Sequence, residues 1–136
     1  MLIVGFGSSS CSAKKGQPVF PVHGKVFFDG EPATGALVIF HPVNHHDPEE
    51  GKPRAVVEKD GSFAVTTYAA GDGAPAGEYA VSIRWKTKTV KHPTRKGFPM
   101  KVATNFPERY QDPKTSRLVV RIQEGSNELP PFDLAD

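Results

Sequence analysis

Residues 54–67 read RAVVEKDGSFAVTT. Two short runs with strand character lie on either side of Asp60-Gly61, a pair that readily adopts the positive φ angles of a tight hairpin turn. Phe63 and Val65 are two residues apart, so they lie on one face of the second run. The stretch predicts a β-hairpin formed by residues 54–58 and 62–67.

Runs with strand character continue on both sides of this hairpin. In residues 22–28 apolar positions alternate with other residues, and Asp29-Gly30 supplies the next turn. Residues 36–41 are apolar on both faces, which indicates a central strand, and Pro42 ends it because proline cannot donate to a ladder. Strand patterns recur at residues 79–86, 118–122 and 128–134.

The composition agrees with many short strands joined by turns. The 136 residues include 13 glycines and 13 prolines, too many turn-formers for a helical bundle. Residues 87–116 lack strand patterning, and only a short helical turn is expected there, around residues 107–110. Seven short strands predict one all-β sandwich domain, which we place at residues 19–136, after a leader and tether at residues 1–18.

Several motifs occur in the order and spacing of a known family. They are VHGKVFFDGEPA (22–33) with GALVIFHP (35–42), DGSFAV (60–65), PAGEYAVSI (75–83), and the later PERYQDP (107–113) and EGSNELPPF (124–132). Together they resemble carboxypeptidase-regulatory-like, or transthyretin-like, β-sandwich domains. The resemblance spans residues 19–134 and is closest to small bacterial envelope lipoproteins built from one such domain.

The resemblance implies a seven-stranded transthyretin-like (prealbumin-like, Greek-key) β-sandwich that carries no catalytic residues. We therefore expect no enzyme and no cofactor, with Phe63 and Tyr79 in the core. Two activities of related sandwiches also lack their motifs here. The chain ends PFDLAD (131–136) instead of the Tyr-Arg-Gly-Ser-like tail of hydroxyisourate hydrolases, and it has no His-x-His of intradiol dioxygenases.

The N-terminal residues carry the prediction of location. An apolar start (1–6) is followed by Gly7-Ser-Ser-Ser-Cys11, which is read either as the tail of a signal peptide or as a disordered tail. The resemblance implies acylation of Cys11, although the branched apolar residue usual three positions earlier is missing. An unmodified cysteine is the alternative. The first interpretation predicts a bacterial envelope protein, either a membrane-anchored lipoprotein or a secreted, periplasmic one.

Charge is unevenly distributed although the formal net charge is only +2. No acidic residue lies between Glu78 and Glu108. The candidate anion-binding residues in this interval are Arg84, Lys86, Lys88, Lys91, Arg95 and Lys96, with Lys101 nearby. Such a patch can bind an anionic glycan or lipid headgroups, or it can be a solvated face that keeps an edge strand from aggregating. We expect no nucleic-acid partner for an exported protein.

A second cluster suggests metal binding, because imidazoles suit zinc, copper and nickel. Its residues are His41, His45, His46 and Asp47, and a solvated polar loop is the alternative. Asp72, between two glycines, predicts a turn and not a calcium loop.

The leading interpretation is a monomeric, non-enzymatic, exported and lipid-anchored interaction module of the cell envelope, whose partner is an envelope protein or a polysaccharide. The alternatives are an accessory protein that binds anionic glycans through residues 84–101, and a metal-binding domain that uses the histidine loop.

Overall fold

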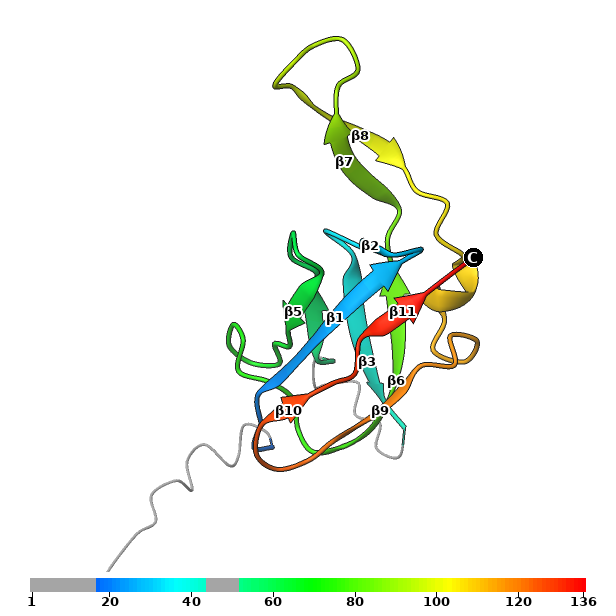
Figure 1. Ribbon diagram of the computed structural model, residues 1–136. Coiled ribbons are helices and arrows are strands. Elements are labelled where there is room, and N and C mark those ends of the chain that lie inside the picture. Colours follow the sequence, from blue (N-terminus) through cyan, green and yellow to red (C-terminus); the bar gives the residue numbers. More distant parts are fainter. Residues whose placement is uncertain (1–16, 44–51) are drawn as a thin grey trace, which may run out of the picture.

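The computed structural model describes residues 17–43 and 52–136. Within these ranges the chain is nearly all β-structure, as predicted, arranged in several sheets (Figure 1). The elements are β1 (Val22–Phe28), β2 (Glu31–Pro32), β3 (Leu37–Pro42), β4 (Arg54–Val56), β5 (Ser62–Ala64), β6 (Gly77–Arg84), β7 (Thr87–Lys91), β8 (Pro99–Ala103), the 3₁₀ helix η1 (Glu108–Gln111), β9 (Val119–Ile122), β10 (Asn127–Glu128) and β11 (Phe132–Leu134).

Two sheets face each other across the core. One is antiparallel, in the order β4-β3-β6-β9. The other is built around β1, where His23 pairs with both β5 and β10, and Phe27 pairs with both β2 and β11. Because one residue can pair with two strands only on opposite edges, β5 and β2 flank one edge of β1, and β10 and β11 flank the other in parallel register.

The predicted hairpin at residues 54–67 forms in part. Arg54 and Thr66 are an antiparallel bridge pair whose two amide-to-carbonyl hydrogen bonds measure 2.9 and 2.8 Å, and the Glu58 amide donates to the Ser62 carbonyl at 2.8 Å. Gly61 has a φ of 93° and its amide donates to the Glu58 carbonyl at 2.9 Å. However, β4 pairs with β3 while β5 pairs with β1, so the two strands belong to different sheets. Alternate residues of both strands are buried between the sheets, and the stretch therefore wraps around the side of the core.

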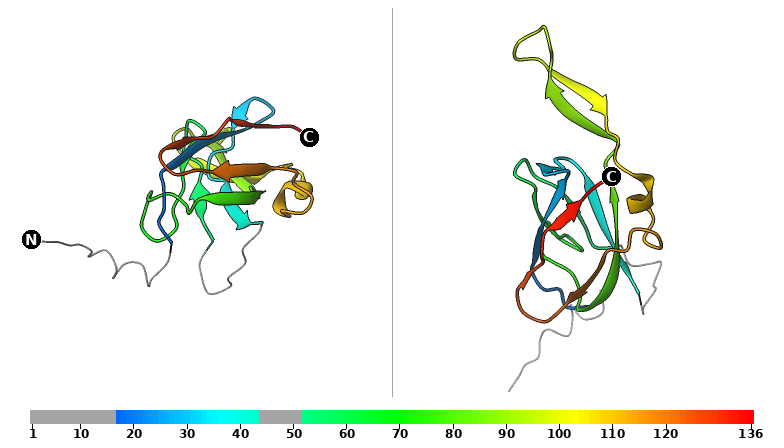
Figure 2. Two further views of the ribbon diagram at one scale, coloured as in Figure 1. Left: turned by 90° about the horizontal axis from the view of Figure 1, so that it is seen from below. Right: turned by 45° about the vertical axis from the view of Figure 1, so that its right-hand side comes forward.

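The expectation that residues 87–116 lack strands is wrong. β7 and β8 form an antiparallel hairpin whose register runs from Thr87 opposite Ala103 to Lys91 opposite Pro99. This hairpin, the arm (residues 87–103), projects from the body of the domain in both side views (Figures 1 and 2). The predicted helical turn near residue 110 is confirmed as η1.

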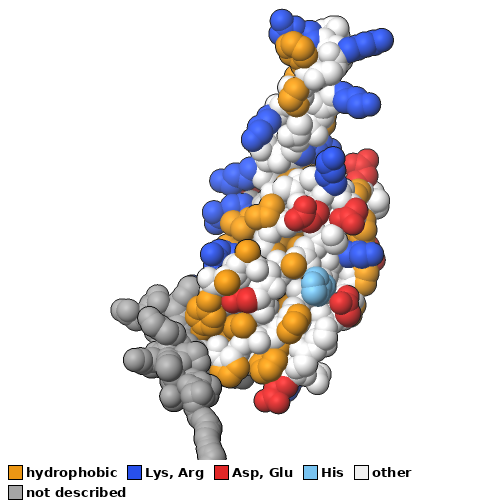
Figure 3. Space-filling view, turned by 90° about the vertical axis from the view of Figure 1, so that its left-hand side faces the viewer, with side chains coloured by type: hydrophobic (Ala, Val, Ile, Leu, Met, Phe, Trp, Pro, Cys, Tyr) orange, Lys and Arg blue, Asp and Glu red, His pale blue; other side chains and the backbone are white. Residues whose placement is uncertain are grey.

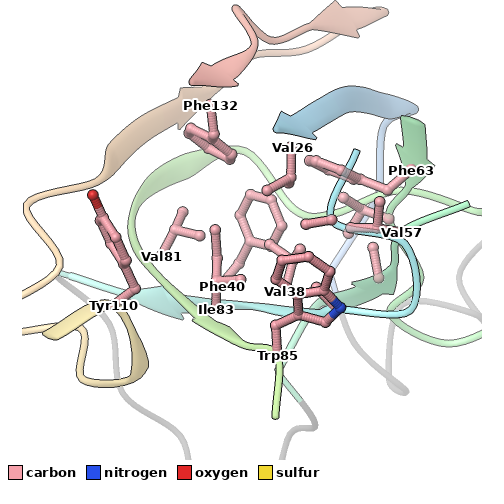
Figure 4. Packing of buried hydrophobic residues seen from close by; sticks show 14 of the residues in the cluster. Val26, Val38, Phe40, Val57, Phe63, Val81, Ile83, Trp85, Tyr110 and Phe132 are labelled. Carbon is pink, nitrogen blue, oxygen red and sulfur yellow. The ribbon is translucent and has the colours of Figure 1, made fainter. Parts of the chain in front are cut away.

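The core lies between the two sheets (Figure 4). Val26 of β1, Val38 and Phe40 of β3, and Val81 of β6 have no exposed surface. The Phe40 ring contacts the rings of two other core aromatics, Phe63 at 6.3 Å and Tyr79 at 6.0 Å between centroids. The prediction that Phe63 and Tyr79 fill the core is therefore confirmed.

Candidate anion-binding arm

The arm is fixed to the body through two core aromatics. Trp85 precedes β7, Phe106 follows β8, and their rings meet edge to face with centroids 5.9 Å apart. The Thr104 hydroxyl donates to the Trp85 carbonyl, and the Thr104 amide donates to the Lys86 carbonyl at 2.9 Å. Both strands therefore leave the core from a common, buried root.

Trp85 also ties this root to the loop between β2 and β3. Its indole Nε1 donates to the Thr34 carbonyl at 2.9 Å, and its ring contacts Phe28 at 6.2 Å between centroids. The side chain is 5% exposed, so Trp85 belongs to the core. A buried Trp N–H normally has such an acceptor, and here the bond orients the ring.

The arm and its root carry all seven basic residues of the interval predicted from sequence. Arg84 ends β6, Lys86 precedes β7, Lys88 and Lys91 lie in β7, Arg95 and Lys96 lie in the turn, and Lys101 lies in β8. Six of them are exposed, and Lys88 is half-buried, with its Nζ 5.8 Å from the Trp85 ring centroid. In Figure 3, Lys and Arg side chains follow the arm, whereas Asp and Glu side chains appear on the body.

The two faces of the arm differ in polarity. Val90 and Met100 form a cross-strand pair and are half-buried, as is Val102. Thr89 and Lys101 form the neighbouring pair and are exposed. Because successive strand residues point to opposite faces, one face of the arm is mainly apolar and the other is polar and basic.

The turn of the arm is closed by a histidine. The His92 Nδ1 accepts the amides of Thr94 at 3.1 Å and Arg95 at 3.0 Å, and the His92 amide donates to the Phe98 carbonyl. The Arg95 guanidinium lies 5.0 Å from the centroid of the Phe98 ring. These contacts hold the cations of the turn on a defined backbone.

A groove of about 390 Å³ lies at the root of the arm, between the arm and the β2–β3 region. Its polar lining comes from Glu31, Thr34, Thr87, Lys88, Thr89 and Lys101. The lysines were predicted from the stretch of sequence that lacks acidic residues. Glu31 and the threonines were not predicted, because nothing in the sequence shows that residues 31–34 lie beside residues 87–101.

The predicted metal cluster is described only in part, since His45, His46 and Asp47 lie outside the described residues. The His41 Nε2 lies 2.8 Å from the Ser82 Oγ on β6. Burial and then Lys52 lower the pKa of His41, against an opposing effect of Asp112. Among residues 17–43 and 52–136, no three His, Cys, Asp or Glu side chains are grouped to hold a metal ion. The metal site stays a prediction.

Two other predictions concern the loop at Asp72 and the N-terminus. The Asp72 carboxylate accepts the amides of Thr67, Tyr68 and Ala69, at 2.8, 3.1 and 2.9 Å, which confirms a turn. Cys11 lies outside the described residues. The part of the chain that the structure describes has no helix long and apolar enough to cross a membrane.

Comparison with known proteins gives no family. No protein-family model matches the sequence, and no curated protein matches it. Solved structures similar to the chain include a 9R-lipoxygenase from Cyanothece PCC8801, with a TM-score of 0.44 and 9% sequence identity. The alignment covers 86% of this chain and 16% of the lipoxygenase chain. Another is the dioxygenase domain of a dioxygenase carbohydrate-binding protein fusion from Streptomyces sp. SirexAA-E, with a TM-score of 0.41 and 20% sequence identity. The alignment covers 89% of this chain and 80% of that domain's chain.

These two structures require one correction. Both are described as oxygenases, which contradicts the prediction that a chain of this kind is not an enzyme, and we withdraw that prediction. The absence of family motifs does not exclude catalysis, because catalytic sites are grafted on folds independently of such motifs. At these TM-scores the likeness carries no argument for an oxygenase activity of this chain.

Proposed function

We propose that this chain is an exported, lipid-anchored interaction module of the bacterial cell envelope, and that its basic arm binds an anionic polysaccharide. We further propose that its domain is a carboxypeptidase-regulatory-like sandwich with the seven-stranded, Greek-key topology of transthyretin. The motifs at residues 22–42, 60–65 and 75–83 support the family and the location. The basic arm supports the proposal that the ligand is an anionic polysaccharide.

The observation that carries the proposal is the separation of charge. Residues 79–107 contain seven of the 17 basic residues and none of the 15 acidic ones, so this interval carries +7. The remaining chain has ten basic and 15 acidic residues, a formal charge of −5. Concentrated positive charge on a projecting element attracts a polyanion, whereas a solvated edge needs only a few lysines.

The position of the arm favours a polysaccharide over the lipids of the anchoring membrane. In Figure 1 and in the right-hand view of Figure 2, the described chain begins (blue) at one end of the domain, and the arm projects from the opposite end. An anchor at Cys11 lies on the N-terminal side of that entry point. The arrangement therefore directs the arm away from the anchored end and from the membrane lipids, towards a polysaccharide of the envelope.

Retention on an immobilised acidic polysaccharide tests the role of the arm. Wild type should bind a polygalacturonate column at low salt and elute as ionic strength rises. The triple variant Lys91→Gln, Arg95→Gln, Lys96→Gln should elute at clearly lower salt. Its control, Lys25→Gln, Lys52→Gln, Lys114→Gln, makes the same charge change on exposed residues of the body. Equal loss of retention in the two variants would show that the arm has no special role.

Fractionation of cells that express the gene with its upstream DNA tests the location. We expect wild type in the membrane fraction and Cys11→Ser in a soluble envelope fraction, because the lipid attached at that residue supplies the anchor. If both proteins stay in the cytosol, export and lipidation are both refuted.

A further inference from the structure

We infer that the groove at the root of the arm is a subsite for one carboxylated sugar unit, a uronate, of the polysaccharide. The inference rests on the proposed function and adds the class of monomer that is recognised. The groove measures about 390 Å³, within the size range of sites for small ligands.

Charges of both signs line this groove. Lys88 comes from β7, Lys101 from β8, and Glu31 from β2. Within the described part of the chain, none of the three has an ion-pair partner within 4.0 Å. Their charges are therefore available to a ligand that brings a negative group and hydrogen-bond donors together.

A uronate matches this arrangement. Its carboxylate pairs with the ammonium group of Lys101, which has donors and no acceptor and lies on the same face of the arm as Thr87 and Thr89. Its ring hydroxyls donate to the Glu31 carboxylate, which only accepts, and exchange hydrogen bonds with Thr87 and Thr89. A heavily sulfated polymer also satisfies the lysines, but its esterified positions leave fewer free hydroxyl groups to donate to the Glu31 carboxylate.

One wall of the groove, formed by Trp85 and the loop at residues 34–35, is fixed by hydrogen bonds within the protein. Trp85 is buried and bonded to the Thr34 carbonyl, and the Thr34 hydroxyl donates to the Lys59 carbonyl at 3.2 Å. The amide of Gly35, the next residue, donates to the Val57 carbonyl at 2.8 Å. A site that needs little ordering on binding loses less free energy to immobilisation.

The decisive variant is Glu31→Gln, titrated with trigalacturonate by calorimetry. Charge attraction alone predicts tighter binding, because one negative charge is removed from a protein that binds an anion. The subsite predicts binding about tenfold weaker, because hydrogen bonds to a charged acceptor are lost. Glu31 is exposed, so the variant should fold. Glu58→Gln, at an exposed acid outside the groove, should bind at least as tightly as wild type.

Dextran sulfate, titrated in parallel, separates the subsite from general polyanion binding. Glu31→Gln should bind dextran sulfate as tightly as wild type or more tightly. If Glu31→Gln binds trigalacturonate as tightly as Glu58→Gln does, the subsite is refuted while the proposed function stands. If the substitutions at Lys91, Arg95 and Lys96 leave polygalacturonate retention equal to that of the body control, the proposed function itself fails.

Discussion

At the scale of single residues, Asp72 shows how one side chain fixes a loop. Its carboxylate accepts three consecutive amides, from Thr67 to Ala69, which organises the segment that leads back to β6. Gly73, the next residue, has a φ of 108°, and a Cβ there would lie 1.8 Å from the Phe20 carbonyl oxygen. The loop is therefore built tightly against the start of the domain.

Removing this carboxylate should destabilise the fold. We expect Asp72→Ala to lower the free energy of unfolding by about 1–3 kcal/mol, the range for leaving hydrogen-bonding groups unpaired. Asp72→Asn keeps one oxygen acceptor and should lose less. Urea denaturation of the three proteins measures both effects, and equal stability of wild type and Asp72→Ala would show that the bonds contribute nothing.

The same residue gives a pH dependence. Burial raises the pKa of Asp72, but the amide hydrogen bonds outweigh it and hold the pKa below its ordinary value of 3.8. Because the folded-state pKa is the lower one, the stabilisation is complete well above pH 3.8 and is lost as the pH falls through the folded pKa. The difference in stability between wild type and Asp72→Ala should therefore shrink below pH 3.8 in denaturation series.

At the scale of elements, the attachment of the arm decides whether it can present its charges. An isolated two-stranded hairpin is marginally stable in water. The arm gains support at its root, where the Thr104 hydroxyl donates to the Trp85 carbonyl. Order should therefore be greatest at the root and decline towards the turn.

Thr104→Val tests this attachment, because it removes the hydroxyl and keeps the branched shape. We expect amide exchange of β7 and β8 to rise several-fold, with exchange in β3 and β6 nearly unchanged, since one hydrogen bond contributes about 1 kcal/mol. Thr89→Val, at an exposed threonine in β7, is the control. If Thr89→Val raises amide exchange in β7 and β8 by as much, the loss of protection comes from the arm surface and not from the hydrogen bond at its root.

Elements with an alternating or a continuous apolar pattern were predictable, and those with few apolar residues were not. β1 and β6 carry a clear period-two pattern, and both appear within one or two residues of their predicted limits. β7 escaped prediction because TKTVK has one apolar residue, and the strand contacts its partner strand instead of the core. The turn at Gly61 was predictable from local conformation, but assigning β4 and β5 to different sheets required their distant partners.

The residues of the candidate site likewise include some that could be predicted from the sequence and some that could not. Its cations could be read from a run of sequence without acids. Glu31 could not, because it reaches the groove only through the pairing of β2 with β1 and the projection of the arm above it.

At the scale of the whole molecule, the core joins the two sheets into one unit. Phe40 comes from the antiparallel sheet, and its ring contacts Phe63 of the sheet around β1. Phe40→Ala should lower the free energy of unfolding by about 3–5 kcal/mol, the typical cost of such a cavity. Val56→Ala, at a residue 58% exposed, is the control and should change stability little. Chemical denaturation measures both, and similar losses would contradict a core centred on Phe40.

The projecting basic arm has a consequence for how the molecule arrives at its target. With +7 on one interval and −5 on the remainder, the protein is an electric dipole despite its small net charge. Near a negatively charged layer the field exerts a torque that turns the arm forwards and the acidic body backwards. Encounters are thus oriented before contact. Because the Debye length is about 8 Å at physiological salt, this alignment begins only in the last nanometre of approach.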